Sequence, residues 1–484
     1  SVHWAERNPD GHAGVGAAEL LGPSEVALGP GETYQTPPVL AVYSADGLDG
    51  LSAAYHRYLR ERPSHPRTPR PVVLNTWEAV YFDHRLERLT RLADVAARLG
   101  VERFVLDDGW FGGRRDDTAG LGDWYVAVDV WPEGLNPLIS HVRKLGMEFG
   151  LWVEPEMVNP DSDLFRAHPD WVLSGSGRPG RLPEAWRNQQ VLDLANPDCW
   201  AFIRERLDTL LSEHDIAFLK WDHNRDLIEA GHGGRPGVHA QTLAVYRLLD
   251  ELRRRHPGVE IESCASGGGR VDLGILARTD RVWASDTNDA LERQHIQRWT
   301  QLLVPPELVG SHVGPPRAHT TGRTHDLSFR VATALFGHFG IEWDIASASE
   351  EEQEALAEAI ACYRRLRPLL HSGQVVRADH PNPAAYLHGV VAQDRAEALF
   401  AYVQLTASAF ETPGLARLPG LDPGRAYRVT PLTVAGEPQT KQAVAPAWAE
   451  AGGVVLAGRV LGEVGLPLPV LRPEQALLLQ LTSP

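Results

Sequence analysis

The sequence predicts an α/β protein: a (β/α)8 TIM barrel, with a remnant of an N-terminal β domain before it and a C-terminal antiparallel β-sandwich after it. Eight short apolar runs alternate with segments whose apolar residues recur every three or four positions, such as RLERLTRLADVAARLG at 85–100. Strands separated by helices form parallel sheets, and eight such strands close a barrel. After about residue 385, strand-like runs with Gly/Pro turns replace the helical pattern.

The first 70 residues are predicted to lie outside the barrel. Residues 1–45 are rich in Gly and Pro with alternating apolar positions, which is typical of the tail of a β domain. Residues 46–70 form a linker in which GLSAAYHRYLRER is helical and the following Pro/Arg stretch is not. Because the chain begins with Ser1 and no signal-like segment follows, we expect its start to be trimmed.

Residues 71–385 are predicted to form the barrel. Its eight strands are expected within PVVLNTW, RFVLDDGW, FGLWVEPE, QVLDL, AFLKWD, EIESC, VWASD and LVGSHV, in chain order. A doubly wound open sheet is the alternative, but no glycine-rich nucleotide fingerprint follows the first strand. Residues 386–484, with runs such as ALFAYVQLTAS and QALLLQLTS, are predicted to form the sandwich.

Composition excludes several classes of partner. The 484 residues carry a net charge of −16, which argues against binding nucleic acid or an anionic membrane surface. No apolar run approaches the roughly 18 residues that a membrane span needs. Three widely spaced cysteines offer neither a disulfide framework nor zinc spacing, so a reducing, cytoplasmic location is expected.

Almost every predicted strand ends in an ionisable or hydrogen-bonding side chain. In a parallel barrel the chemistry lies at the C-terminal strand ends, so these side chains are expected to converge on one polar, acidic pocket. A single carboxylate at such a place is usually a turn residue or a helix N-cap, but a set this large is not. The residues are Trp77, Glu78, Asp107, Asp108, Glu154, Glu156, Asp193, Lys220, Asp222, Glu262, Cys264, Asp286 and His312.

Three chemistries fit an acidic pocket in a barrel. A metal site is disfavoured because no HxH or HExxH pattern is present, and the loop carrying His312, His319 and His325 lacks ligand spacing. A Schiff-base lysine is disfavoured because Asp222 would keep the neighbouring Lys220 protonated. Glycoside hydrolysis needs two carboxyl groups facing each other across an anomeric carbon, and the pocket supplies them. No cofactor or metal is therefore expected.

Several motifs resemble those of the family 36 glycoside hydrolases, the bacterial α-galactosidases. They include NTWEAVYFD, LDDGWFGGRRDD, LWVEPEMVNPDSDL, RNQQVLDLANP, KWDHNRD, ESCASGGGRVDLG and WASDTNDALERQHIQ. The resemblance covers about residues 20 to 480 in the order of the family. It implies that a large N-terminal β-supersandwich precedes the barrel in relatives and that only its last strands remain here. It also implies a homo-oligomer, since family members are often tetramers.

The resemblance implies two catalytic carboxyl groups. The aspartate of the KWD motif, Asp222, corresponds to the nucleophile, and Lys220 beside it is suited to keep it ionised. The aspartate of the WxSD motif, Asp286, corresponds to the acid/base, with a pKa raised by the nearby nucleophile. Asp289 is the rival for this second role, but its place at the start of DALERQHIQRWTQLL is typical of a helix cap or first-turn charge.

The resemblance also implies a set of sugar-binding residues. Asp107 and Asp108 correspond to the acids that bind the galactose 4- and 6-hydroxyls, and Cys264 and Gly267 to the loop that faces the 2-position. The remaining candidates are clamps on the ring hydroxyls or aromatic walls: Trp77, Arg187, Lys220, Trp221, Asn224 and Trp283.

The expected function is hydrolysis of terminal non-reducing α-D-galactosyl residues from melibiose- or raffinose-type oligosaccharides, with retention of configuration. Three alternatives stay open: an α-N-acetylgalactosaminidase, a raffinose-type transglycosylase and an inactive carbohydrate-binding relative. Cys264 argues against the first, because it fills the space that an acetamido group needs. The presence of both Asp222 and Asp286 argues against the last.

Overall fold

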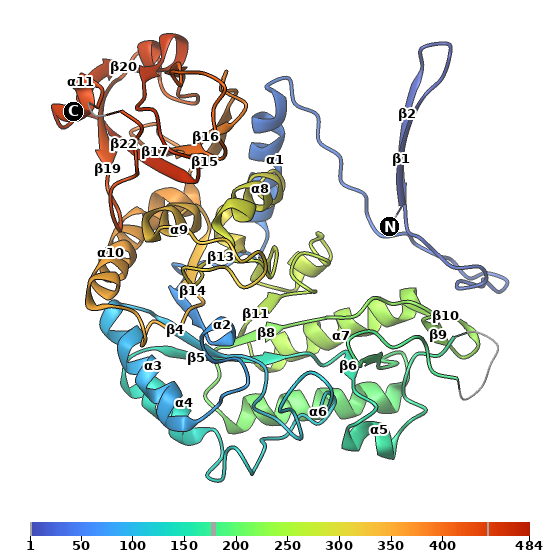
Figure 1. Ribbon diagram of the computed structural model, residues 1–484. Coiled ribbons are helices and arrows are strands. Elements are labelled where there is room, and N and C mark those ends of the chain that lie inside the picture. Colours follow the sequence, from blue (N-terminus) through green and yellow to red (C-terminus); the bar gives the residue numbers. More distant parts are fainter. Residues whose placement is uncertain (1, 176–180, 443–444) are drawn as a thin grey trace.

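A closed barrel of eight parallel strands forms the centre of the computed structural model, which describes residues 2–175, 181–442 and 445–484 (Figure 1). The last strand pairs with the first, so no sheet edge is left open. The predicted fold class is confirmed. In chain order the strands are β3 (Val73–Asn75), β4 (Arg103–Leu106), β5 (Glu148–Val153), β8 (Phe218–Trp221), β11 (Glu260–Ser263), β12 (Arg281–Trp283), β13 (Val309–Val313) and β14 (His338–Ile341).

Amphipathic helices cover the outside of the barrel. In α3 (Leu86–Leu99) the apolar residues at three- and four-residue spacing are buried, and Gly100 ends the helix with a φ of 97°. A capping box of Ser349 and Glu352 starts α10 (Glu350–Ser372). The others are α2 (Trp77–Val80), α4 (Asn136–Lys144), α5 (Asp163–Ala167), α6 (Pro197–Glu213), α7 (Val238–Arg255), α8 (Ala290–Thr300) and α9 (Leu327–Ala334), with short helices η1 (Ile275–Ala277) and η2 (Pro306–Leu308).

One predicted barrel strand was wrong. QVLDL contributes only β7 (Gln190–Val191), which pairs outside the barrel with β6 (Met157–Val158), and Asp193 lies 2.7 Å from the imidazole of His232. The eighth barrel strand is instead β14, whose His338 and Gly340 interrupt the apolar pattern that marks a strand. Glu342 directly follows β14, so it replaces Asp193 at the catalytic end of the barrel.

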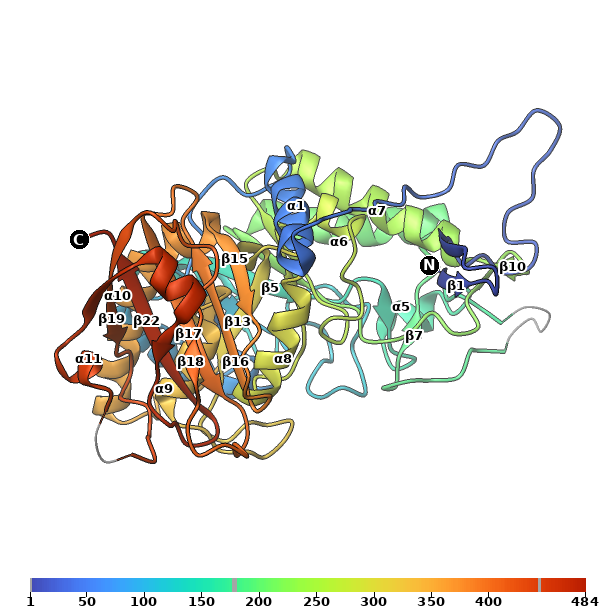
Figure 2. The ribbon, with the colours of Figure 1, turned by 90° about the horizontal axis from the view of Figure 1, so that it is seen from above.

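A six-stranded antiparallel sheet follows the barrel and packs beside α9 (Figure 2). Its order is β15 (Gln374–Ala378), β16 (Ala385–Val391), β17 (Glu397–Gln404), β22 (Gln475–Thr482), β19 (Ala426–Leu432) and β20 (Val454–Ala457). The predicted sandwich is therefore one large sheet, accompanied in the described residues by the two-stranded pair β18 (Leu415–Ala416) and β21 (Leu466–Pro467), with α11 (Ala447–Glu450) and η3 (Val460–Val464). Strand β15 precedes residue 386, and that domain boundary stays a prediction.

The N-terminal segment forms a hairpin that projects from the body (Figure 1). Strands β1 (Val2–Arg7) and β2 (Ala13–Ala18) pair only with each other among the described residues. Glu19 then accepts a hydrogen bond from His239 at 2.6 Å, near the small hairpin of β9 (Gly231–His232) and β10 (Arg235–Pro236). Helix α1 (Gly47–Glu61) lies where the helical linker was expected. In the described parts of the chain, no helix is long and apolar enough to cross a membrane.

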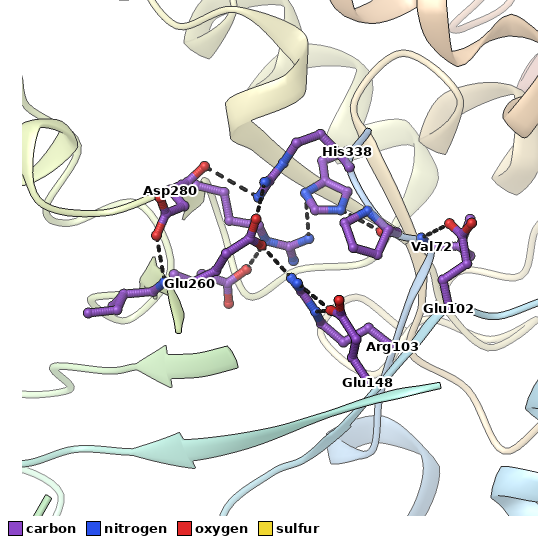
Figure 3. Close-up of polar contacts among 12 residues, drawn as sticks. Val72, Glu102, Arg103, Glu148, Glu260, Asp280 and His338 are labelled. Carbon is purple, nitrogen blue, oxygen red and sulfur yellow. Dashed lines mark hydrogen bonds and ion pairs between the residues drawn. The ribbon is translucent and has the colours of Figure 1, made fainter. Parts of the chain in front are cut away.

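The N-terminal end of the barrel is closed by buried charges, which we call the barrel floor (Figure 3). Glu260, the first residue of β11, accepts hydrogen bonds from Arg70 at 2.6 Å and from Arg103 at 2.7 Å. Arg103 also pairs with Glu148 at 2.6 Å. Arg281 contacts Glu262 and the imidazole of His338. Side chains point alternately into and out of the barrel along each strand. Val73, Val105 and Phe218 pack together as a small apolar cluster.

Removing the central acid of the floor is expected to destabilise the protein. Glu260→Ala leaves the guanidinium groups of Arg70 and Arg103, both nearly fully buried, without their shared partner. Breaking a buried ion pair from one side costs about 3–5 kcal/mol of unfolding free energy. The two arginines, against the opposing effect of burial, lower the pKa of Glu260 to about 2. This stabilisation is therefore present above the ordinary glutamate pKa and is lost as the pH falls toward 2.

Glu148→Ala is the matched control, because Glu148 pairs with the same Arg103 but its side chain is 41% exposed. Removing the Glu148 carboxylate is expected to cost about 1 kcal/mol or less of unfolding free energy. Chemical unfolding of both variants measures the difference. Equal destabilisation by the two substitutions would contradict a special role for Glu260.

Candidate active site

The C-terminal strand ends bring acidic and hydrogen-bonding side chains together, as the sequence predicted. Asp107 and Asp108 follow β4, Glu154 follows β5, and Asp222 follows β8. Cys264 follows β11 and Asp286 lies three residues beyond β12. Except for Asp286, which is exposed, these side chains have nine-tenths or more of their surface buried. Burial strengthens the electrostatic interactions among them.

Asp222 is held as a carboxylate. Its Oδ2 accepts a hydrogen bond from the indole of Trp152 at 3.2 Å, and its Oδ1 accepts one from the backbone of His223 at 2.8 Å. Burial alone would raise its pKa, but the Lys220 ammonium and hydrogen bonds from Cys264, Asn224 and the backbone of His223 outweigh burial, so the pKa lies below the usual value. Sequence reasoning missed Trp152 because an indole inside an apolar strand is usually part of the core.

The pKa of Asp286 is shifted in the opposite direction from that of Asp222. Burial and the negative charge of Asp222 raise its pKa to about 6. The thiol of Cys264 contacts its Oδ1 at 3.6 Å. Burial and both carboxylates raise the pKa of Cys264, so it stays a thiol. The pocket thus holds one ionised and one readily protonated carboxyl on either side of a small, neutral side chain.

Asp107 and Asp108 have separate cationic partners. Asp107 accepts a hydrogen bond from the ammonium of Lys220 at 2.7 Å. Asp108 binds the guanidinium of Arg114 in two parallel contacts, from Nε at 2.9 Å and from Nη2 at 2.7 Å. Bidentate pairing fixes the orientation of a carboxylate. Arg114 was not among the predicted residues, although it stands directly after the glycines of LDDGWFGGRRDD.

Two glutamates behind Asp222 differ in protonation. Burial and the charge of Asp222 raise the pKa of Glu154 to about 8. Burial opposes ionisation of Glu156 as well, but Arg270 at 2.7 Å and the imidazole of His223 hold its pKa well below the usual range. Glu154 is therefore a neutral acid at pH 7, where its oxygens accept hydrogen bonds from the backbone of Asn224 and from Gln189.

Glu154→Gln is expected to keep kcat/KM within about threefold of the wild-type value, because an amide imitates a neutral carboxyl group. Gln189 accommodates the amide by rotation, since its Oε1 has no donor among the described residues. Glu154→Ala is the contrasting variant. Its kcat/KM is expected to fall about tenfold, because the substitution leaves the buried Asn224 N–H unpaired. Steady-state kinetics at pH 7 compare the two. A loss of a hundredfold in the amide variant would show that an ionised Glu154 is required.

Four further predicted residues lie around these carboxyl groups. Asn224 accepts a hydrogen bond from Ser266 at 3.2 Å, and Trp77 is partly exposed beside Tyr81. Trp283 is buried and packs on the imidazole of His312, with ring centroids 4.3 Å apart. Gly267 has a φ of 79°, and a Cβ there would lie 2.6 Å from the backbone nitrogen of Asp286. Glycine therefore lets the loop approach Asp286.

The binding roles of two further residues, Trp221 and Arg187, stay predictions. Trp221 points away from the barrel interior into the main core and donates a hydrogen bond to Glu156 at 2.9 Å, so it supports the pocket from behind. Arg187 is exposed in a loop at a φ of 51°. Alternation along a strand separates Trp221 from Lys220 and Asp222.

The remaining sequence candidates have structural partners. Asp289 accepts hydrogen bonds from the backbones of Leu291 and Glu292, as expected for the N-cap of α8. His312 binds Glu342, whereas His325 faces Glu474 at 3.3 Å. Among the residues that the structure describes, no group of three His, Cys, Asp or Glu side chains is placed to hold a metal ion.

Comparisons with known proteins agree with this architecture. The Melibiase family model matches residues 33–373, and the model of the glycosyl hydrolase family 36 C-terminal domain matches residues 385–481. An Escherichia coli alpha-galactosidase is 47% identical over 483 residues, covering 98% of this chain and 68% of that protein. Alpha-galactosidase AgaA of Geobacillus stearothermophilus is 41% identical, over 84% of this chain and 57% of the relative.

Solved structures of relatives superpose on this chain. The crystal structure of AgaA superposes with a TM-score of 0.86 at 37% identity, covering 94% of this chain and 62% of the AgaA chain. The structure of AgaB from the same organism gives a TM-score of 0.86 at 38% identity, over 94% of this chain and 61% of that one. The chain thus spans roughly three fifths to two thirds of the length of these relatives. On this evidence the chain belongs to the melibiases of glycoside hydrolase family 36.

Proposed function

We propose that the chain is the catalytic part of a retaining α-galactosidase, which hydrolyses terminal non-reducing α-D-galactosyl residues of melibiose- or raffinose-type oligosaccharides. The observation that carries the proposal is the opposite shift in the pKa values of two neighbouring carboxyl groups, with the pKa of Asp222 lowered and that of Asp286 raised to about 6. Double displacement needs this combination of a nucleophilic carboxylate and a protonated acid. The relatives described above are named as α-galactosidases, and AgaA variants have been solved with raffinose and with stachyose.

In the first half-reaction, a carboxylate oxygen of Asp222 attacks the anomeric carbon and the glycosidic bond breaks. The departing oxygen takes the proton of Asp286, so the aglycone leaves as a neutral alcohol and a β-galactosyl ester remains on Asp222. In the second half-reaction, Asp286 removes a proton from water, whose oxygen attacks the same carbon. Asp222 leaves as a carboxylate, and galactose is released with its α-configuration retained.

The proposed recognition of galactose uses the charged pairs beside the nucleophile. The Asp107 carboxylate and the Lys220 ammonium, 2.7 Å apart, offer acceptors and donors to vicinal hydroxyls, and Asp108 is fixed by Arg114. A substrate that lacks a hydroxyl leaves such a buried charge unpaired, which penalises the wrong sugar. The thiol of Cys264 stands between the two catalytic carboxyl groups and leaves little room for an acetamido group, so we favour galactose over N-acetylgalactosamine.

A chromogenic α-galactoside assayed beside its N-acetyl analogue tests the proposal, with NMR of the first-formed sugar to establish its anomeric configuration. Faster turnover of the galactoside and initial release of the α-anomer are expected, also after prolonged chelation. Preference for the N-acetyl sugar would favour the α-N-acetylgalactosaminidase, and transfer to added sugars in place of hydrolysis would favour the transglycosylase. Binding without turnover of either substrate would identify an inactive carbohydrate-binding relative.

The setting of the enzyme is part of the proposal. We infer a cytoplasmic location, which is supported by three cysteines that all lie in the described residues as free thiols. We also infer that the whole protein forms a homo-oligomer, as the family resemblance implies. Sedimentation of the intact protein tests the second inference, and a monomer would contradict it.

A further inference from the structure

A second pair of buried carboxyl groups lies beside the proposed catalytic pair. Glu342, at the end of β14, accepts a hydrogen bond from the amide of Asn75 at 3.0 Å and contacts Nδ1 of His312 at 2.8 Å. Glu78, in the short helix α2 that follows β3, accepts a hydrogen bond from the amide of Asn288 at 2.8 Å. Asn288 is two residues beyond Asp286, so this cluster is continuous with the loop that carries the proposed acid/base.

The hydrogen bonds of His312 fix its tautomer. Its Nε2 accepts a hydrogen bond from Nη2 of Arg281 at 3.0 Å, so Nδ1 carries the proton and donates it to Glu342. Burial and the arginine charge hold the pKa of His312 well below its usual value, which keeps the ring neutral. Glu342 therefore receives one donor on each oxygen, as a carboxylate requires.

The two glutamates of the cluster differ in charge. Burial and the nearby Glu342 raise the pKa of Glu78 to about 8, so Glu78 holds a proton at neutral pH. Its Oε2 meets no hydrogen-bond donor among the described residues, which also fits a neutral carboxyl group. The cluster thus contains one neutral acid and one carboxylate.

We propose that Glu342 is a positioning residue for Asp286, whose carboxylate, locked by Asn75 and His312, supplies a negative charge that is unchanged throughout the reaction. The inference rests on the proposed function and deepens it. Asp222 loses its charge when it becomes the galactosyl ester, and the repulsion that favours protonation of Asp286 is then lost. Glu342 keeps its charge in both half-reactions. Asp286 therefore retains enough proton affinity in the ester to accept the proton of the attacking water.

Several other titratable groups surround Asp286 and Glu342. Asp286 faces Asp222 and Lys220 from the end of β8, Cys264 from β11 and Arg293 from α8. The groups that face Glu342 are Glu78, Tyr81, Asp107, Lys220, Asp286, Arg293 and His312. The two cations offset part of the charge of Glu342. Removal of that charge consequently leaves Asp286 with an excess of positive neighbours.

Glu342→Gln tests the proposal through the pH profile of kcat/KM on an aryl α-galactoside. Loss of the negative charge lowers the pKa of Asp286, so the alkaline limb is expected to move to lower pH by roughly 0.5–1 unit. The amide can be accommodated, because Oδ1 of Asn75 has no donor among the described residues and can accept from it after rotation. A purely structural role would lower activity at every pH and leave the limb in place.

Glu78→Gln is the matched control in the same cluster. It replaces a neutral carboxyl with an amide, so its alkaline limb is expected to stay within about 0.2 unit of wild type. If Glu342→Gln does not fold, Glu342→Asp and Glu342→Asn provide a pair of equal length that differs only in charge. The alkaline limb of the asparagine variant is then expected to lie at a lower pH than that of the aspartate variant.

An unmoved limb in Glu342→Gln, or equal limbs in the aspartate and asparagine variants, would overturn the role of Glu342 while wild-type activity upholds the proposed function. A wild-type protein without α-galactosidase activity would instead overturn the proposed function and, with it, this inference. A limb that moves equally in the Glu78 and Glu342 amide variants would also overturn it, because the effect would then not depend on the charge.

Discussion

Asp222→Ala is expected to lower kcat by about 10³-fold or more and to regain activity in azide, with β-galactosyl azide as the product. The carboxylate is buried between the indole of Trp152 and the ammonium of Lys220, so its removal leaves a cavity the size of a small anion next to a fixed positive charge. Azide entering there attacks the anomeric carbon from the side opposite the leaving group. One displacement in place of two inverts the configuration.

Asp193→Ala provides the control, because Asp193 pairs with His232 outside the barrel and is expected to change kcat by less than about threefold. NMR of the azide product determines its configuration. An α-azide product, or no rescue at all, would remove Asp222 from the role of nucleophile. A variant that retains wild-type kcat would exclude double displacement through this residue altogether.

Asp286→Ala is expected to affect substrates according to their leaving groups. Protonation of the glycosidic oxygen matters most when the departing alkoxide is basic, so melibiose is expected to lose about 10²–10⁴-fold in kcat/KM. A dinitrophenyl galactoside needs little protonation and is expected to lose far less. Deglycosylation then lacks its base, so the ester on Asp222 accumulates and the aryl alcohol appears in a burst.

The pH dependence carries the second signature of Asp286. Burial and the charge of Asp222 raise its pKa to about 6, so the wild-type enzyme is expected to lose kcat/KM as the pH rises through that value. This alkaline limb should flatten in Asp286→Ala, and azide should accelerate turnover while giving the α-azide. Asp289→Ala is the comparison, because it removes an N-cap worth about 1 kcal/mol of stability. If only Asp289→Ala showed the dependence on leaving group, the two assignments would be reversed.

The sequence predicted the number of barrel strands but not their identity. QVLDL is apolar and buried like a barrel strand, yet its β7 forms a two-stranded antiparallel sheet with β6, outside the barrel. The true last strand, β14, alternates a buried histidine and glycine with apolar residues, because its inner face meets the ionic floor and the imidazole of His312. A hydrophobic pattern reports burial, and it does not tell which partner provides it.

The sequence likewise predicted part of the candidate site and missed contacts that depend on how the strands are arranged. Asp222, Asp286, Asp107 and Asp108 stand at strand ends or in motifs that sequence alone can find. Sequence reasoning placed Lys220 beside Asp222, whereas its closest partner is Asp107, which follows β4, two strands away in the barrel. Such pairs between distant strands depend on register, which follows only from the closed sheet. Glu342 was missed for the same reason that β14 was, although the acid that ends GHFGIE is the same signal as in the other strands.

The ionic floor gives the barrel an unusual response to temperature. Hydration of charged groups becomes less favourable as water warms, so keeping Arg70, Arg103 and Glu260 out of water costs less at high temperature than at low temperature. An aliphatic floor would gain no such advantage, because hydrophobic stabilisation per unit area levels off on heating. We therefore expect the N-terminal end of the barrel to keep more of its stability on warming than an aliphatic floor would.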